Sequence, residues 1–137
     1  MEAAATKMIA VDTNVLIRFV VNDDPDQFRR AKAFLAGNDV VLLTTVVLEC
    51  EWVLRSGYDY SREQIGAALV GLFGLPRVTL QDRATLLWAL HGYQNGMEFP
   101  DALHLAGASQ AAAFATFDAD LKRRAAKLDA FVPVIAP

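Results

Sequence analysis

The sequence predicts an α/β fold, specifically a three-layer α/β/α sandwich with a mainly parallel central sheet. Short apolar runs alternate along the chain with longer segments that carry helix start and stop signals. Strands separated by helices are joined by right-handed crossovers, which makes neighbouring strands parallel. Hydrophobic residues make up 54% of the 137 residues, which suits a sheet buried on both faces.

Local patterns define the elements of this fold in chain order. Apolar runs predict strands over residues 8–11, 40–44, 77–80, 113–117 and 132–135. Periodicity and cap signals predict helices over residues 14–20, 25–36, 46–55, 62–74, 83–94, 100–111 and 118–127. The run over 77–80 is equally compatible with plain extended chain. Pro133 makes the last strand an edge strand, because proline cannot donate to the ladder.

Several helix starts are marked by side chains that can cap free backbone N–H groups. The patterns at Asp24 and Ser61 are the strongest, because Gln27 and Gln64 follow three residues later and complete a capping box. The full set of expected caps is Asp24, Thr45, Ser61 and Asp82.

Length and composition predict a single domain over residues 1–137, with residues 1–7 as a candidate disordered extension. The longest nearly apolar run, Val40 to Leu48, is far shorter than the roughly 20 residues of a membrane-spanning helix. The N-terminus lacks the positive start and apolar core of a signal peptide. With Cys50 as the single cysteine, no internal disulfide can form, and we expect a cytoplasmic protein.

The net charge of −3 provides no general attraction for nucleic acid. Two local basic clusters do exist, around Arg29-Arg30 and around Lys122-Arg123-Arg124. For each cluster taken alone, a solvated helix face is the favoured interpretation.

Four acids are predicted to meet at one edge of the sheet. Asp12 and Asp118 directly follow predicted strands, while Glu49 and Asp101 lie near the starts of predicted helices. In a parallel α/β sheet, strand C-termini and the following helix N-termini share the edge where ligands bind. The competing interpretation is that these acids simply cap helices and complement the helix dipole, and for Asp118 alone it is the favoured one.

Clustered carboxylates with few basic neighbours repel one another, and a divalent cation relieves that repulsion. Oxygen-only ligands favour Mg²⁺ or Mn²⁺. One cysteine and two histidines far apart in sequence provide no zinc-type spacing.

At this point the chain resembles the PIN-domain ribonucleases, and among them the VapC-like toxins of bacterial toxin–antitoxin pairs. The matching segments are Val11–Leu16 with Asp12, Thr45–Leu54 with Glu49, Glu98–His104 with Asp101, and Thr116–Asp120 with Asp118. Glu98 stands where an aspartate is usual and Pro100 where a small residue is usual, but all four acids are present. Helical periodicity does not separate Glu49 from Glu51, so that choice rests on the resemblance.

The resemblance implies a ribonuclease in which Asp12, Glu49, Asp101 and Asp118 hold Mg²⁺ or Mn²⁺. It also implies a homodimer, an RNA substrate such as tRNA or mRNA, and a small cognate antitoxin whose basic side chain enters the acidic groove. Chains of this kind commonly open on the first strand, so translation starting at Met8 is a further hypothesis. The sequence does not identify the RNA, the number of metal ions or the antitoxin.

Residues near the acids have supporting or structural interpretations. Thr13, Asn14 and Thr116 are candidates to hydrogen-bond the carboxylates or the scissile phosphate, with a structural turn role equally supported. Asp120 is favoured as a solvated helix residue, and His104 as a packed one. The aromatic residues Trp52, Trp88 and Phe28 are interpreted as core or dimer contacts, and Cys50 as a core residue.

Two other classes of function compete with the nuclease. A metal-dependent phosphatase or phospho-acceptor domain also places an acid at a strand end. The phosphatase pattern, however, wants a second aspartate at position 14, which is asparagine. A non-catalytic RNA-binding module on the same scaffold is the third possibility, and loss of one of the four acids would favour it.

Overall fold

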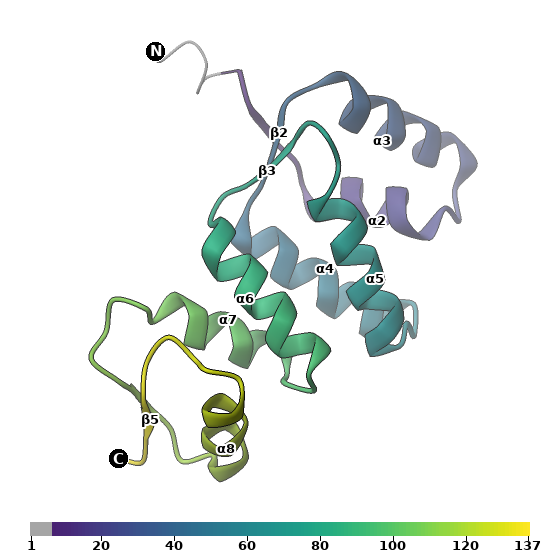
Figure 1. Ribbon diagram of the computed structural model, residues 1–137. Coiled ribbons are helices and arrows are strands. Elements are labelled where there is room, and N and C mark those ends of the chain that lie inside the picture. Colours follow the sequence, from purple (N-terminus) through teal and green to yellow (C-terminus); the bar gives the residue numbers. More distant parts are fainter. Residues whose placement is uncertain (1–6) are drawn as a thin grey trace. The chain divides into compact units, whose positions relative to one another are not determined.

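The computed structural model describes residues 7–137, which form two compact units. The first unit ends at Arg83, and the second comprises Ala84–Pro137 (Figure 1). The predicted disordered extension, residues 1–7, lies outside the described residues except for its last member.

The first unit is built on a three-stranded parallel sheet in the order β1-β2-β3. Its elements are β1 (Ile9–Ala10), α2 (Thr13–Val21), α3 (Pro25–Gly37), β2 (Val40–Leu42), α4 (Thr44–Gly57), α5 (Arg62–Phe73) and β3 (Val78–Leu80). In the central strand, Val40 pairs with both Ile9 and Val78. The core is apolar, with Leu16, Leu42 and Leu54 fully buried.

The second unit combines three helices with a two-stranded parallel ladder. Its elements are α6 (Arg83–Gln94), α7 (Phe99–Gly107), β4 (Phe114–Ala115), α8 (Ala119–Lys127) and β5 (Val134–Ile135). The first residue of α6, Arg83, is the last residue of the first unit. Phe114 pairs with Val134. Gly96, at φ 99°, makes the turn between α6 and α7, and its carbonyl accepts a hydrogen bond from Arg124 at 3.1 Å.

These elements confirm the α/β class and the parallel strands. Among the described residues, β1, β2 and β3 pair in the first unit, and β4 pairs with β5 in the second. The three-layer arrangement and the single domain stay predictions. Among the residues that the structure describes, no helix is long and apolar enough to cross a membrane.

The cap predictions are confirmed at Asp24 and Ser61. Asp24 accepts a hydrogen bond from the Gln27 N–H at 3.1 Å. The capping box of α5 is complete, because Ser61 Oγ accepts from the Gln64 N–H at 3.1 Å and Gln64 Oε1 accepts from the Ser61 N–H at 2.8 Å.

Two boundary predictions are wrong. The helix after β2 begins at Thr44 rather than Val46, and Thr45 does not cap it: Gln81 reaches from the end of β3 and accepts from the Thr44 N–H at 2.9 Å. The predicted helix over 100–111 ends at Gly107, where the Ala108 N–H turns back to the carbonyls of His104 and Leu105. Tertiary contact supplies the first cap, and local turn formation stops the second helix.

Replacing Ser61 by alanine should lower the free energy of unfolding by about 1 kcal/mol, since it removes one side of a complete capping box. Urea titration followed by circular dichroism measures this change. Ser56→Ala, at an exposed site near the end of α4, is the matched control and should be close to neutral. Equal effects of the two substitutions would contradict a capping role.

Candidate functional site

Asp12 lies directly after β1 and is the N-cap of α2. Its backbone is extended (φ −76°, ψ 161°), and Oδ1 accepts the Thr13 N–H at 2.8 Å. The capping interpretation is therefore correct for this acid. It does not exclude a ligand role, because the side chain is exposed and that hydrogen bond is formed by one oxygen.

Thr13 connects the start of α2 to Glu49 on α4. Its side chain is buried at 5% exposure, and Oγ1 donates a 2.5 Å hydrogen bond to Glu49 Oε1. Glu49 itself is exposed. This short contact brings the glutamate to the residue that follows Asp12, so the first unit places two of the four predicted acids beside one threonine.

The structure separates Glu49 from Glu51, which the sequence pattern did not. Glu51 is buried at 1% exposure, and its Oε2 accepts from Arg55 Nε at 2.8 Å within the same helix. A buried carboxylate that is held in an ion pair contributes to the packing of α4. Glu49 is the residue of the two whose carboxylate reaches the surface near Asp12.

In the second unit, Asp118 follows β4 and caps α8. Its Oδ1 accepts from the backbone N–H groups of Asp120 and Leu121, at 2.9 and 3.1 Å. Thr116 Oγ1 accepts from the Asp118 N–H at 3.1 Å, which is the structural turn role predicted as one alternative. Asp120 is exposed and forms an ion pair with Arg123, in agreement with a solvated helix residue.

Asp101 lies in the first turn of α7 and is partly buried. Burial raises the pKa of its carboxyl group, and the nearby negative charges of Asp118 and Glu98 raise it further, while His104 opposes the shift. Asp101 and Asp118 are thus close enough to repel each other. A divalent cation between or beside two such carboxylates would favour their charged forms.

The four predicted acids fall into two pairs, Asp12 with Glu49 in the first unit and Asp101 with Asp118 in the second. Within either unit, the described residues contain no group of three or more His, Cys, Asp or Glu side chains that could hold a metal ion. Convergence of all four acids on one rim stays a prediction. The donors in both pairs are carboxylate oxygens, which fits Mg²⁺ or Mn²⁺.

Other residues singled out in the sequence have mixed outcomes. Cys50 is buried, and desolvation raises the pKa of its thiol to about 12, so it is a core residue. Phe28 stacks on Phe19 with 6.1 Å between ring centroids, and Trp88 packs against Phe131 at 5.9 Å. His104 is exposed rather than packed, and Trp52 is 57% exposed and so is not a core residue of this chain.

Arg18 was not singled out from the sequence, and Arg30 was interpreted only as part of a solvated helix face, yet both line a cavity together with Asp12. The sequence pattern that could have indicated these residues is their spacing along the helices. Asn14 and Arg18 lie one turn apart on α2, and Gln27 and Arg30 lie one turn apart on α3. Which side of each helix faces the other was not readable without the packing of α2 on α3.

Comparison with protein families identifies a PIN domain over residues 9–127. This range includes β1, all four predicted acids and the whole of α8. No curated protein matches the chain.

Replacing Thr13 by valine should lower the free energy of unfolding by about 1–2 kcal/mol, because a buried hydroxyl loses its hydrogen bond to a carboxylate. Thr13→Ser keeps the donor and should retain most of that stability. Guanidinium denaturation of the three proteins measures the difference. A valine variant as stable as the parent protein would show that the bond contributes nothing to the fold.

Proposed function

The chain belongs to the PIN-domain family, and on this basis we propose that it is a metal-dependent ribonuclease that hydrolyses phosphodiester bonds in RNA. PIN domains are typically metal-dependent nucleases, so membership supports a hydrolase that acts on nucleic acid. The observation that carries the proposal is that the family match contains acids at all four expected positions: Asp12, Glu49, Asp101 and Asp118.

The residues that would hold Mg²⁺ or Mn²⁺ are these four acids, with Asp12 and Asp101 as the central ligands. When bound, such a cation supplies activation of a water nucleophile and neutralisation of the charge that builds on the phosphate. Burial raises the pKa of Asp101, and the negative charge of Asp118 raises it further. Two carboxylates that repel each other in this way favour the binding of a divalent cation, which neutralises their charge.

The protein itself contributes orientation. Asp12 is held by the Thr13 N–H, and Asp118 by two N–H groups of α8, so each acid has one fixed oxygen. Glu49 is fixed by the hydroxyl of Thr13 and is suited to orient the attacking water. Carboxylates held in this way lose little freedom when a ligand binds, which favours binding. Thr116 supports the turn that presents Asp118, because its hydroxyl oxygen accepts the Asp118 N–H.

We further propose that the protein acts as the cytoplasmic toxin of a type II toxin–antitoxin pair. Support comes from the resemblance of the four acidic segments to VapC-like toxins. The corresponding partners are a tRNA or mRNA substrate, a second copy of the chain, and a small antitoxin. An exposed acidic site attracts a basic side chain of such an antitoxin, because opposite charges steer association.

The central test is cleavage of labelled tRNA and mRNA by chelator-stripped protein, with Mg²⁺, Mn²⁺ or Ca²⁺ added back separately. Cleavage should require Mg²⁺ or Mn²⁺. Asp12→Asn should lower the rate on the order of a hundredfold or more, since a ligand carboxylate is replaced by a neutral group. Metal-independent cleavage, or full activity of Asp12→Asn, would overturn the proposal. Binding of RNA by an inactive parent protein would instead favour the non-catalytic module.

Glu49 and Glu51 provide a matched pair of variants on one helix. Glu49→Gln should abolish most of the RNA cleavage because it removes the negative charge. It should leave stability nearly unchanged, because the amide oxygen of glutamine can still accept the hydrogen bond from Thr13. Glu51→Gln should do the reverse and destabilise the fold by about 1–3 kcal/mol, since it removes a buried carboxylate that is paired with the half-exposed Arg55. Thermal unfolding and cleavage rates are measured on the same preparations. The opposite pattern would transfer the site role from Glu49 to Glu51.

A further inference from the structure

A cavity of about 410 Å³ lies between the first half of α2 and the facing side of α3, entirely within the first unit. Its volume is within the range of roughly 300–1,000 Å³ that is usual for ligand sites. Asp12 and Asn14 lie at one border, and Gln27, Arg30 and Phe34 contribute from α3. The cavity therefore adjoins the acid that is the first proposed metal ligand.

Two arginines line this cavity, and each retains unused hydrogen-bonding capacity. Arg18 uses Nη1 in a 3.0 Å ion pair with Asp23 at the end of α2, while its Nε is buried and has no hydrogen-bond partner. Arg30 is exposed, and no described residue forms an ion pair with it. A buried N–H without an acceptor is costly, which indicates a ligand or water acceptor at this position.

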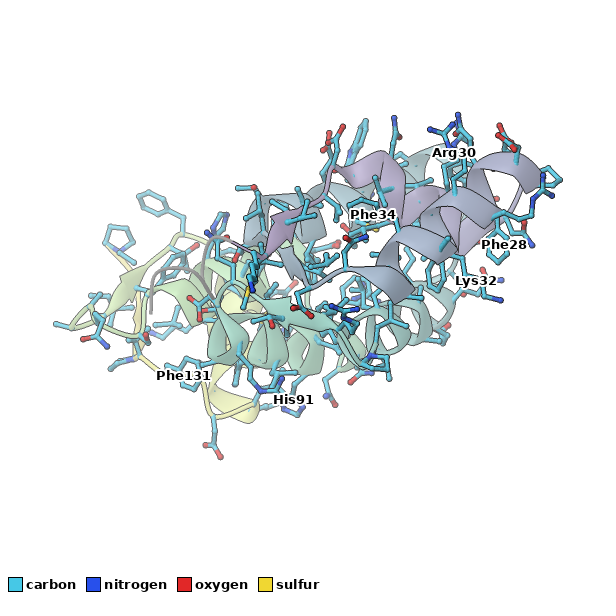
Figure 2. The ribbon with its side chains drawn as sticks, turned by 90° about the horizontal axis from the view of Figure 1, so that it is seen from above. Phe28, Arg30, Lys32, Phe34, His91 and Phe131 are labelled. Atoms are coloured by element: carbon cyan, nitrogen blue, oxygen red, sulfur yellow. The ribbon has the colours of Figure 1, made fainter. Side chains whose placement is uncertain are left out.

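The rest of the lining is apolar. Val11, Val15, Ala31 and Phe34 form a hydrophobic wall beside the charged groups. Figure 2 shows Arg30 and Phe34 on α3, together with Phe28 and Lys32 of the same helix. Lys32 lies over the Phe28 ring, with Nζ 5.9 Å from the centroid. On α3, Lys32 is therefore engaged with the Phe28 ring, whereas Arg30 is available at the cavity.

We propose that this cavity holds one nucleotide of the RNA strand, next to the phosphate that is cleaved. The guanidinium groups of Arg18 and Arg30 would bind the phosphate of this nucleotide, and the base would lie against the wall formed by Val15, Ala31 and Phe34. The inference rests on the proposed nuclease function and deepens it by identifying where the substrate strand is held.

Three features favour a nucleotide over a simple anion. A cavity that only bound phosphate would not need the apolar wall, which is suited to the face of a base. Asp12 at the border of the cavity would repel a free anion. An RNA strand that continues from the cavity to Asp12 would instead be attracted by a cation that Asp12 holds. Amide groups of Asn14 and Gln27 add donors and acceptors of the kind that contact base edges.

The chain offers a matched pair for testing the arginine contact. Arg29 and Arg30 are neighbours on α3, and replacing either by glutamine changes the net charge equally. Arg29 does not line the cavity, is 70% exposed and is paired with Asp26 at 3.4 Å. Any difference between the two variants therefore reports position and not overall charge. Gln27→Trp is a third variant, which fills the cavity without changing charge.

The experiment measures anisotropy of a fluorescein-labelled single-stranded RNA of mixed sequence, titrated with full-length protein in EDTA so that no cleavage occurs. Arg30→Gln should raise Kd about fivefold and reduce the slope of log Kd against log salt by roughly 0.7, as expected for one lost phosphate contact on a single strand. Arg29→Gln should leave both quantities within about twofold of the parent. Gln27→Trp should raise Kd at least as much as Arg30→Gln.

Cleavage kinetics provide the second readout. Arg30→Gln should raise KM and leave kcat unchanged, because the contact is made in both the ground state and the transition state. Equal effects of Arg29→Gln and Arg30→Gln would overturn the inference in favour of general charge attraction. Metal-dependent cleavage with unchanged Kd and KM for Arg30→Gln and Gln27→Trp would overturn it while the nuclease function stands. A parent protein that neither binds nor cleaves RNA would defeat both.

Discussion

The hydrogen bond from Thr13 to Glu49 is the contact on which the geometry of the first unit's site depends. It joins the first residue of α2 to the second turn of α4, which are 36 positions apart in sequence. Because Thr13 is buried, its hydroxyl can be satisfied only by a group that reaches in, and the glutamate does so. This contact therefore links α2 to α4 and holds the Glu49 carboxylate at the residue that follows Asp12.

For the acids of this protein, capping a helix is compatible with the proposed binding of a cation. Asp12 and Asp118 each cap a helix with one oxygen, which stabilises the backbone at that point and holds the carboxylate in a defined orientation. A carboxylate has two oxygens and about four lone-pair positions. Capping therefore leaves capacity for a cation, and the choice between a cap and a ligand, which the sequence poses as an alternative, does not arise.

Several arginines of this protein form hydrogen bonds or ion pairs within the fold, whereas Arg30 forms none with the residues that the structure describes. Around α8, Arg124 binds the carbonyl of Gly96 and Arg123 pairs with Asp120, so both stabilise the second unit. On α3, Arg29 pairs with Asp26 while Arg30 is left at the cavity. Arg30 is therefore left at the cavity near Asp12, whereas Arg123 and Arg124 are engaged in contacts within the second unit.

The sequence by itself determined the α/β class, the parallel strands and the helix caps at Asp24 and Ser61, because these depend on hydrophobic periodicity and on contacts within a few residues. It did not determine that Gln81 caps α4, that Glu51 is buried in an ion pair while Glu49 is exposed, or that Arg18 and Arg30 share a cavity. Each of these depends on which faces of two elements meet. That is decided by packing between segments distant in sequence, and only the tertiary structure contains it.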